Sequence, residues 1–152
     1  MFDGNYPSTI DDKKRACIPK KLRFRLGERV RVAKGFERCL VVHTVEDWLK
    51  FVEKYISNRS LADEKARKLR RFYLGGSREL DIDQQGRINL PVDLMEYAGI
   101  DKDAVFVGCG DYIEIWDPLL YKEEMDPKNT DPKELMRDAV IKADAAEAPD
   151  KA

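Results

Sequence analysis

Two stretches of the chain carry the same order of apolar, polar and turn-forming residues, 72 positions apart. The first, residues 10–19, reads IDDKKRACIP, and the second, residues 82–91, reads IDQQGRINLP. A glycine follows eight residues after the proline in each copy. Proline favours the first turn of a helix and glycine the position just past its end. The pattern therefore predicts short helices over Pro19–Leu26 and Pro91–Ala98.

Alternating apolar residues on either side of polar turns predict a strand pair after each helix. The two pairs are expected at Arg29–Ala33 with Cys39–His43, and at Ala104–Val107 with Tyr112–Trp116. Each pair leads into a helix start, because Thr44 with Asp47 resembles a capping box and Asp117 precedes a proline. Each repeat thus reads as strand, turn, strand, short helix, strand pair and helix.

Each repeat spans about 45 residues, too few to bury a stable core alone. We therefore expect the two repeats to pair with each other or with repeats of other chains. Between them, Ser60–Leu74 is a predicted helix with Ser60 as its cap. After Asp126, Glu134–Ala143 is a predicted helix and Ala143–Ala152 is a predicted frayed or disordered tail.

These elements predict an α+β fold that is mainly β, arranged in four segments. Residues 5–48 form the first unit, residues 49–76 a helical connector, residues 77–120 the second unit, and residues 121–152 a C-terminal helix and tail.

Charge is divided unevenly along the chain, although the net charge of the 152 residues is only −1. Residues 1–76 hold 19 Lys/Arg and 10 Asp/Glu, whereas residues 77–152 hold 9 Lys/Arg and 19 Asp/Glu. A basic half can present a positive surface to phosphate while the whole chain stays near neutral. No apolar run approaches the roughly 20 residues of a membrane span, and Met1–Asn5 lacks signal-peptide features. We expect a cytoplasmic protein without a membrane partner.

Neither a metal site nor a catalytic centre is expected from the sequence. Cys17, Cys39 and Cys109 are widely spaced, His43 is the only histidine, and the chain has no C-x-x-C. The cysteines are therefore interpreted as small semi-buried thiols in a reducing compartment. P-loop, G-x-S-x-G and H-E-x-x-H motifs do not occur, so no cofactor and no small-molecule substrate are predicted.

Each repeated block places an aspartate and an arginine around a tight turn. A leading aspartate accepts hydrogen bonds from backbone N–H groups two residues on, so Asp11 and Asp83 are predicted to structure their turns. Gly86 suits a positive φ in the second turn. If each aspartate also pairs with its arginine, Arg15 or Arg87, the motif has a purely structural explanation as a stiffened turn.

The cations on these turns favour a polyanionic partner instead. Lys13, Lys14 and Arg15 concentrate three positive charges on one protrusion, which is unfavourable unless a polyanion lies opposite. A two-stranded ribbon fits the DNA major groove, where Arg or Lys can read guanine. In the second turn Gln85 and Arg87 are the candidate DNA contacts, or this turn mainly completes the fold.

A further set of basic side chains follows the first turn and is expected to contact phosphate rather than bases. The set consists of Lys20, Lys21, Arg23 and Arg25.

Several longer motifs surround the repeated blocks. In the first half they are Gly4-x-Tyr6, Thr9-Ile10-Asp11-x-Lys13-x-Arg15-x-x-Ile18-Pro19 and Gly35-x-x-x-Cys39-Leu40. In the second half they are Phe72-x-x-Gly75, Leu80-Asp81-x-Asp83-x-Gln85-Gly86-Arg87-Ile88-x-Leu90-Pro91, Glu96-Tyr97-Ala98-Gly99 and Ile113-Glu114-Ile115-Trp116. Over about residues 1–125 the chain thereby resembles the MraZ family of bacterial regulators, within the SpoVT–AbrB superfamily.

This resemblance implies two AbrB-like swapped-hairpin halves in a pseudo-symmetric double-split β-barrel with short helices. It implies a nucleoid-associated transcriptional regulator without cofactors, assembled as a ring-shaped homo-oligomer. The implied partner is double-stranded DNA carrying short direct repeats in the promoter of its own division and cell-wall gene cluster. One departure is Lys14, where the family usually has glycine; lysine adds a cation and fits a positive φ less well.

Two other functions remain open on sequence grounds. AbrB-like proteins also serve as antitoxins, but those usually carry one hairpin unit per chain, whereas this chain has two. The duplicated unit could also be a scaffold or assembly module that does not bind DNA. A scaffold, however, has no need for Lys13-Lys14-Arg15 on a turn.

Overall fold

The strands form a six-stranded antiparallel sheet and a separate two-stranded ribbon in this computed structural model, which describes residues 1–147. The first repeat contributes β1 (Asn5–Thr9), β2 (Arg15–Cys17), β3 (Arg29–Lys34) and β4 (Leu40–Thr44). The second contributes β5 (Arg78–Asp81), β6 (Arg87–Asn89), β7 (Asp103–Gly108) and β8 (Ile113–Trp116). All eight strands lie within one compact unit, Met1–Pro118.

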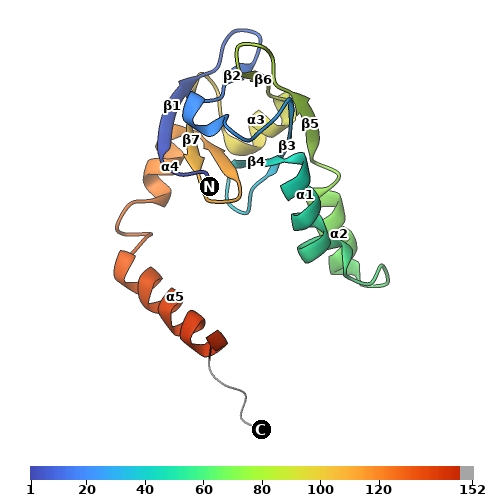
Figure 1. Cartoon of the computed structure of the whole chain (residues 1–152), viewed down its shortest axis with the longest axis vertical. Helices are drawn as coiled ribbons and strands as arrows, with labels where there is room; N and C mark the ends of the chain where they lie inside the picture. Colours follow the sequence, from blue (N-terminus) through green and yellow to red (C-terminus); the bar gives the residue numbers. More distant parts are fainter. Residues whose placement is uncertain (148–152) are drawn as a thin grey trace. The chain divides into compact units, whose positions relative to one another are not determined.

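The two repeats exchange their first strands. In the sheet the order is β1-β7-β8-β4-β3-β5, so β1 of the first repeat pairs with β7 of the second, and β5 of the second pairs with β3 of the first. The remaining strands, β2 and β6, pair with each other side by side at one end of the unit (Figure 1). The order is unchanged when the repeats trade places, which is the pseudo-symmetric double-split arrangement predicted above.

The strand–turn–strand hairpin expected within each repeat does not form as a paired ribbon. Between β1 and β2 the sheet contains a single bridge, Ile10↔Ala16, because β1 runs along β7 from Asn5↔Val107 to Thr9↔Asp103. Exchange gives each first strand a full-length partner and brings both apolar faces into one core, which a single repeat is too small to build. The two-stranded ribbon of this fold is therefore β2–β6.

Matched positions of the two repeats fill the core. Ile18 and Leu90 are 0% and 1% exposed, and Leu22 and Leu94 are 1% and 0% exposed. Phe106 is also fully buried among side chains from both repeats. The core is thus shared, as expected for units too small to fold alone.

The two predicted short helices differ in the structure. The second is α3 (Val92–Ala98), with Asp93 in its first turn and Gly99 at φ 65° after its end. The first is only a 3-10 turn, η1 (Lys20–Leu22), so the helix predicted over Pro19–Leu26 is wrong. Lys20 and Lys21 oppose the helix dipole in the first turn of this segment, which has no acid, whereas α3 has Asp93 in its first turn.

Three helical segments follow β4. They are α1 (Val45–Val52), the π-helical segment η2 (Glu53–Ser57) and α2 (Glu64–Tyr73). The Thr44 hydroxyl accepts a hydrogen bond from the Asp47 N–H at 3.0 Å, which confirms the predicted cap. The helix predicted from Ser60 instead begins at Glu64, because the Asp63 carboxylate caps it through the Lys65 N–H at 2.9 Å.

The chain from Leu119 onward forms a second compact unit and is described by itself. Its helices are α4 (Pro118–Glu124), which starts just before it, and α5 (Pro132–Glu147). Residues 143–147, predicted to be frayed, belong to α5, and the rest of the predicted tail, residues 148–152, lies outside the described residues. None of the described helices has both the length and the apolar character that crossing a membrane requires.

Candidate nucleic-acid interface

The β2–β6 ribbon presents one apolar and one polar face. Its central pair, Ala16↔Ile88, is 0% exposed on both sides and points into the core. Because side chains alternate along a strand, the flanking pairs Arg15↔Asn89 and Cys17↔Arg87 lie on the opposite face. The two arginines therefore occupy diagonal corners of one outer surface.

An aspartate organises the first turn. Asp11 Oδ1 accepts hydrogen bonds from the backbone N–H groups of Lys13 at 3.0 Å and Arg15 at 2.9 Å. Asp11 Oδ2 accepts a hydrogen bond from Arg15 Nε at 2.7 Å. The arginine side chain is thereby held against its turn, with 29% of its surface exposed.

The second turn repeats this geometry. Asp83 Oδ1 accepts from the N–H groups of Gln85 at 2.9 Å and Arg87 at 2.8 Å, and Asp83 Oδ2 accepts from Arg87 Nε at 2.8 Å. The backbone N–H of Arg87 contributes most to lowering the pKa of Asp83, as that of Arg15 does for the pKa of Asp11. Both carboxylates are thus ionised, and each fixes one guanidinium through a charge-assisted bond.

Both turns place a left-handed residue at the same position. Lys14 has a φ of 64° and Gly86 a φ of 79°, and each donates its N–H to the aspartate carbonyl of its turn at 3.0 Å. Lys14 is the one non-glycine residue with positive φ among residues 1–147. The departure noted in the sequence therefore coincides with a backbone conformation that costs a lysine more than a glycine.

Backbone bonds tie each turn to the other repeat. The Leu90 N–H donates to the Lys14 carbonyl at 2.9 Å, and the Ile18 N–H donates to the Gly86 carbonyl at 2.8 Å. Since these bonds are reciprocal, the two turns and the ribbon form one rigid surface. We name it the ribbon face, and it comprises Lys13, Lys14, Arg15, Gln85 and Arg87.

Arg23 braces the second turn. Its Nε donates to the Ile18 carbonyl at 2.6 Å, and its Nη1 donates to the Gln85 carbonyl at 3.4 Å. The guanidinium packs so closely over Gly86 that a side chain at that position would collide with it. The sequence predicts a phosphate contact for Arg23 and does not reveal its hydrogen bonds to the other repeat. The matching residue in the second repeat is the buried Met95. An arginine in one repeat where the other has a buried methionine is a signal that could have pointed to this contact.

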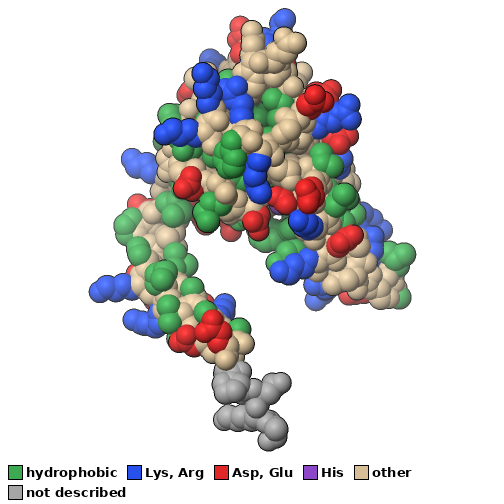
Figure 2. All heavy atoms as spheres, viewed as in Figure 1, with side chains coloured by type: hydrophobic (Ala, Val, Ile, Leu, Met, Phe, Trp, Pro, Cys, Tyr) green, Lys and Arg blue, Asp and Glu red, His purple; other side chains and the backbone are tan. Residues whose placement is uncertain are grey.

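The lysines of the candidate surface are exposed. Lys13 and Lys14 project from the first turn, and Lys20 and Lys21 lie on the adjacent η1. Figure 2 shows Lys and Arg side chains over the upper part of the Met1–Pro118 unit, around the end that carries β2 and β6, with Asp and Glu side chains beside them. Phosphate could approach these ammonium groups without rearrangement of the fold.

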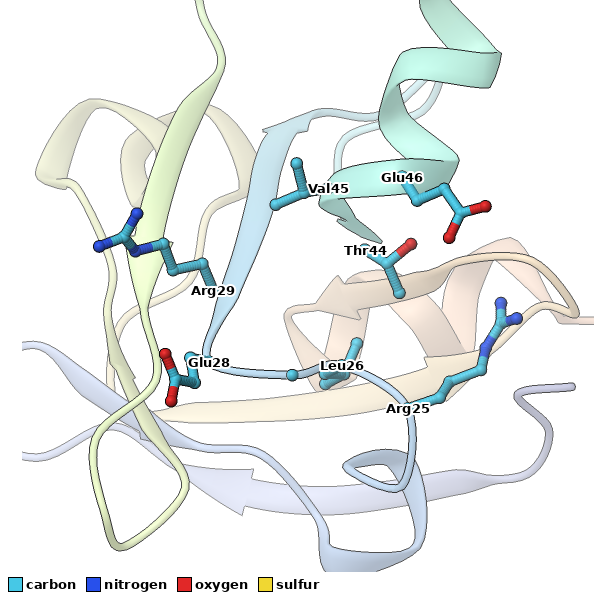
Figure 3. Close-up of a pocket in the computed structure, with 8 residues that line it drawn as sticks. Arg25, Leu26, Glu28, Arg29, Thr44, Val45 and Glu46 are labelled. Carbon is cyan, nitrogen blue, oxygen red and sulfur yellow. The ribbon is translucent and has the colours of Figure 1, made fainter.

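Arg25 has a different environment. It lines a surface hollow of about 480 Å³ between the segment after η1 and the start of α1, which Arg29 also lines (Figure 3). Arg25 Nη2 lies 2.8 Å from Asp47 Oδ2, and Arg29 Nε lies 3.0 Å from Asp81 Oδ1. Both cations are therefore paired within the chain, and Arg25 is less suited to phosphate than the lysines of η1.

Side chains with metal-ligand chemistry lie elsewhere in the described residues. The donor atoms of Glu37, Cys39 and Glu114 are within 4.8 Å of one another. None of them belongs to the ribbon face.

Comparison with known proteins finds one family that matches both halves of the chain. Its model, described as "MraZ protein, putative antitoxin-like", matches residues 1–72 and residues 73–138. The division between the two matches falls between the repeats found in the sequence.

Individual relatives, named as transcriptional regulators, match the chain over most of their length. The chain is 42% identical over 123 residues to "Transcriptional regulator MraZ" of Thermoanaerobacter sp. (strain X514), which covers 81% of this chain and 85% of the relative. A relative of the same name from Desulfitobacterium hafniense (strain Y51) has the same identity and coverage. Another, from Dictyoglomus thermophilum, is 44% identical over 116 residues, covering 76% of this chain and 79% of the relative.

Proposed function

The chain belongs to the MraZ family, and from that premise we propose that it regulates transcription by binding double-stranded DNA through the ribbon face. The observation that carries the proposal is the β2–β6 ribbon, which holds Arg15 and Arg87 on one outer surface. A two-stranded ribbon of this kind fits the width of the major groove.

The two arginines suit base recognition better than the lysines do. In each turn the aspartate engages Nε, so the guanidinium plane is fixed before DNA arrives. The Nη groups are then available for guanine O6 and N7, and less side-chain entropy is lost on binding than for a free arginine.

The lysines supply the sequence-independent part of binding. Lys13, Lys14, Lys20 and Lys21 are exposed around the first turn, whereas the second turn offers Gln85 beside Arg87. Lysine contacts to phosphate position a protein on DNA and make its affinity depend on salt. The first turn is accordingly the stronger anchor, and the second contributes specificity or shape.

Target and assembly follow from the family resemblance. We propose a ring-shaped homo-oligomer that binds short direct repeats upstream of its own division and cell-wall gene cluster, in the cytoplasm at the nucleoid. Exposed large apolar side chains outside the ribbon face support contacts between subunits, among them Leu49 at 58% and Val92 at 56% exposed. Several weak sites held in one ring would bind repeated DNA with increased affinity.

The test measures binding to DNA from upstream of the protein's own gene, with a scrambled duplex of equal length beside it. Arg15→Ala is expected to weaken specific binding by about 1–3 kcal/mol and to leave the oligomer intact. Lys142→Ala removes the same charge from α5, where Lys142 pairs with Asp138 on the surface, and serves as the matched control. Unchanged operator affinity in Arg15→Ala, measured by fluorescence anisotropy, shows that the ribbon face is not the contact surface.

One observation supports the alternative hypothesis of an antitoxin, because the description of the matching family contains the words "putative antitoxin-like". An antitoxin would bind a protein partner as well as DNA. Co-expression with neighbouring genes and co-purification separates the two functions, since a regulator needs no such partner. A scaffold is indicated if no DNA is bound even at about 50 mM salt, where electrostatic binding is strong.

A further inference from the structure

The sheet brings together a thiol and two carboxylates from two parts of the chain that lie far apart in the sequence. Cys39 directly precedes β4, and β4 pairs with β8 so that Val41 faces Glu114. The donor atoms of Glu37, Cys39 and Glu114 lie within 4.8 Å of one another. We call these three residues the thiol–carboxylate cluster.

The cluster lies on the face of the sheet turned away from the core. Leu40, Ile113 and Ile115 point into the core, so the alternating positions Cys39 and Glu114 point the other way. Cys39 is 0% exposed, Glu114 is half-buried, and Glu37 is exposed. The cluster is therefore closed to solvent on the side of Cys39 and open on the side of Glu37, through which an ion could enter.

Neighbouring groups hold the ligands in place. Trp116 Nε1 donates a hydrogen bond to Glu114 Oε1 at 3.0 Å, which fixes the carboxylate. The Tyr97 hydroxyl donates to the carbonyls of Gly35 at 2.9 Å and Glu37 at 3.1 Å, which fixes the turn that carries Glu37 and Cys39. Supporting hydrogen bonds of this kind are typical of metal sites.

Gly35 explains why this turn can bring Cys39 inward. A Cβ added to Gly35 would lie 2.5 Å from Cys39 Sγ, so only glycine lets the thiol pack against the turn. The Gly35 N–H also donates to the Cys39 carbonyl at 2.8 Å, closing the β3–β4 turn. The Gly35-x-x-x-Cys39 motif, which has no place in the ribbon face, thus acquires a structural role.

Acidic groups are crowded here without a compensating cation. Among residues 1–147 the ion pairs involve neither Glu37 nor Glu114. A divalent cation would offset this concentration of negative charge.

From this geometry we infer that the thiol–carboxylate cluster binds one zinc ion through Cys39, Glu37 and Glu114. One thiolate and two carboxylates fill three positions of a tetrahedral zinc site and leave the fourth to water, with bonds of about 2.3 Å to sulfur and about 2.0–2.2 Å to oxygen. Binding releases the one thiol proton to solvent and changes no oxidation state. The ion would clamp the β3–β4 turn of the first repeat to β8 of the second.

The sequence argued against such a site because it contains no closely spaced ligand pair. Cys39 and Glu114 are 75 positions apart, and only the β4–β8 pairing brings them together. Zinc binding at this site is independent of the proposed DNA contact, so the two proposals can fail separately.

The test uses the reduced full-length protein, freed of metal and titrated with Co²⁺ and then with Zn²⁺. Cobalt bound to thiolate shows an intense sulfur-to-metal charge-transfer absorption, so one equivalent per chain should produce this band and one equivalent of Zn²⁺ should remove it. Cys39→Ser should abolish the band. Cys17→Ser removes an exposed thiol outside the cluster and should leave the band unchanged.

Two milder variants keep the test decisive if Cys39→Ser does not fold. Glu37→Gln alters an exposed ligand and should weaken Zn²⁺ binding at least tenfold. Tyr97→Phe removes only the hydroxyl that fixes the turn and should weaken it by about tenfold. The inference is overturned if folded wild-type protein gives no charge-transfer band, or if the band persists unchanged in Cys39→Ser.

Discussion

Two residues at matched positions show how the repeats have diverged. Lys14 and Gly86 both have positive φ, yet Lys14 is exposed while Gly86 is buried under Arg23. A lysine in this conformation costs on the order of 1 kcal/mol relative to glycine. Its retention on the ribbon face is consistent with a charge that serves binding rather than folding.

Lys14→Gly should therefore raise the stability of the protein and lower its affinity for DNA. We expect the free energy of unfolding to rise by up to about 1 kcal/mol, because relief of the strained backbone is partly offset by the greater freedom of glycine in the unfolded chain. Operator affinity should fall, and the slope of log affinity against log salt should decrease by about one. Urea unfolding and anisotropy measurements at several salt concentrations check both effects; a variant that is less stable contradicts the strain argument.

The contact between Arg23 and Gly86 gives a second prediction at this scale. Gly86→Ala should destabilise the protein by about 1–3 kcal/mol, since the new methyl group meets the guanidinium and φ is 79°. Adding Arg23→Ala should recover part of this loss, because the collision is removed. A double-mutant cycle by thermal unfolding measures the coupling, and strictly additive effects would show that Arg23 does not brace the turn.

Among the elements, α1 and β4 enclose the single histidine. The His43 ring is 5.5 Å from Trp48, 5.4 Å from Phe51 and 5.6 Å from Tyr112, measured between centroids. Burial lowers the pKa of His43 from 6.5 to about 4, although the charges of Asp47 and Asp111 act in the opposite direction. The folded state therefore favours the neutral ring.

Stability should consequently depend on pH through His43. Between pH 6.5 and about 4 the unfolded chain binds a proton that the native chain does not, so the free energy of unfolding falls as pH decreases through this window. The loss attributable to His43 is up to about 3 kcal/mol, and the contribution is fully present above pH 6.5. His43→Phe keeps an aromatic ring in the cluster and should flatten this part of the profile.

Urea unfolding of both proteins at pH 7, 6, 5 and 4 provides the measurement. Carboxylates titrate near the lower end in both, so the difference between the two profiles reports on His43 alone. Parallel profiles would show that His43 titrates normally in the folded state.

Local signals in the sequence identify most of the elements. The Asp-x-x-x-Arg blocks, the Thr44 cap and the strand pairs around Gly35 and Gly110 depend on short-range hydrogen bonds and apolar alternation, so they are visible along the chain. The spacing of proline and glycine predicts the first short helix wrongly, because it takes no account of Lys20 and Lys21 in a first turn that has no acid. The start of α2 was misplaced because Ser60 and Asp63 are both good caps and only packing selects between them.

Strand exchange and long-range contacts could not be read from the same signals. The residues of β1 are compatible with pairing to β2 or to β7, and the shared core decides between the two. Arg23 over Gly86 and the thiol–carboxylate cluster both join positions more than 60 residues apart. The family resemblance implied the exchange, whereas neither of these contacts followed from the resemblance.

At the scale of the whole molecule, the two repeats share one sheet, so the charge difference between the two halves of the sequence has to be interpreted in space. The basic first half and the acidic second half are not separate bodies, since β1 lies beside β7 and β5 beside β3. A positive surface therefore depends on where individual cations emerge, and Lys13, Lys14 and Arg15 emerge together at one turn. Under the proposed function, one such turn per chain would be a weak DNA site, so the affinity would depend on the number of chains in the complex.

A series of duplexes with one, two and three direct repeats tests this dependence. If several ribbon faces of one ring bind together, affinity should increase by about 10²–10⁴ between one repeat and several, without any new type of contact. Changing the spacing by half a helical turn, about 5 base pairs, should remove most of the gain, because neighbouring repeats then face opposite sides of the duplex. Arg15→Ala should lose more affinity on three repeats than on one, since every site in the ring carries the change. If affinity is the same for all three duplexes, each chain binds DNA on its own and the ring has no role in recognition.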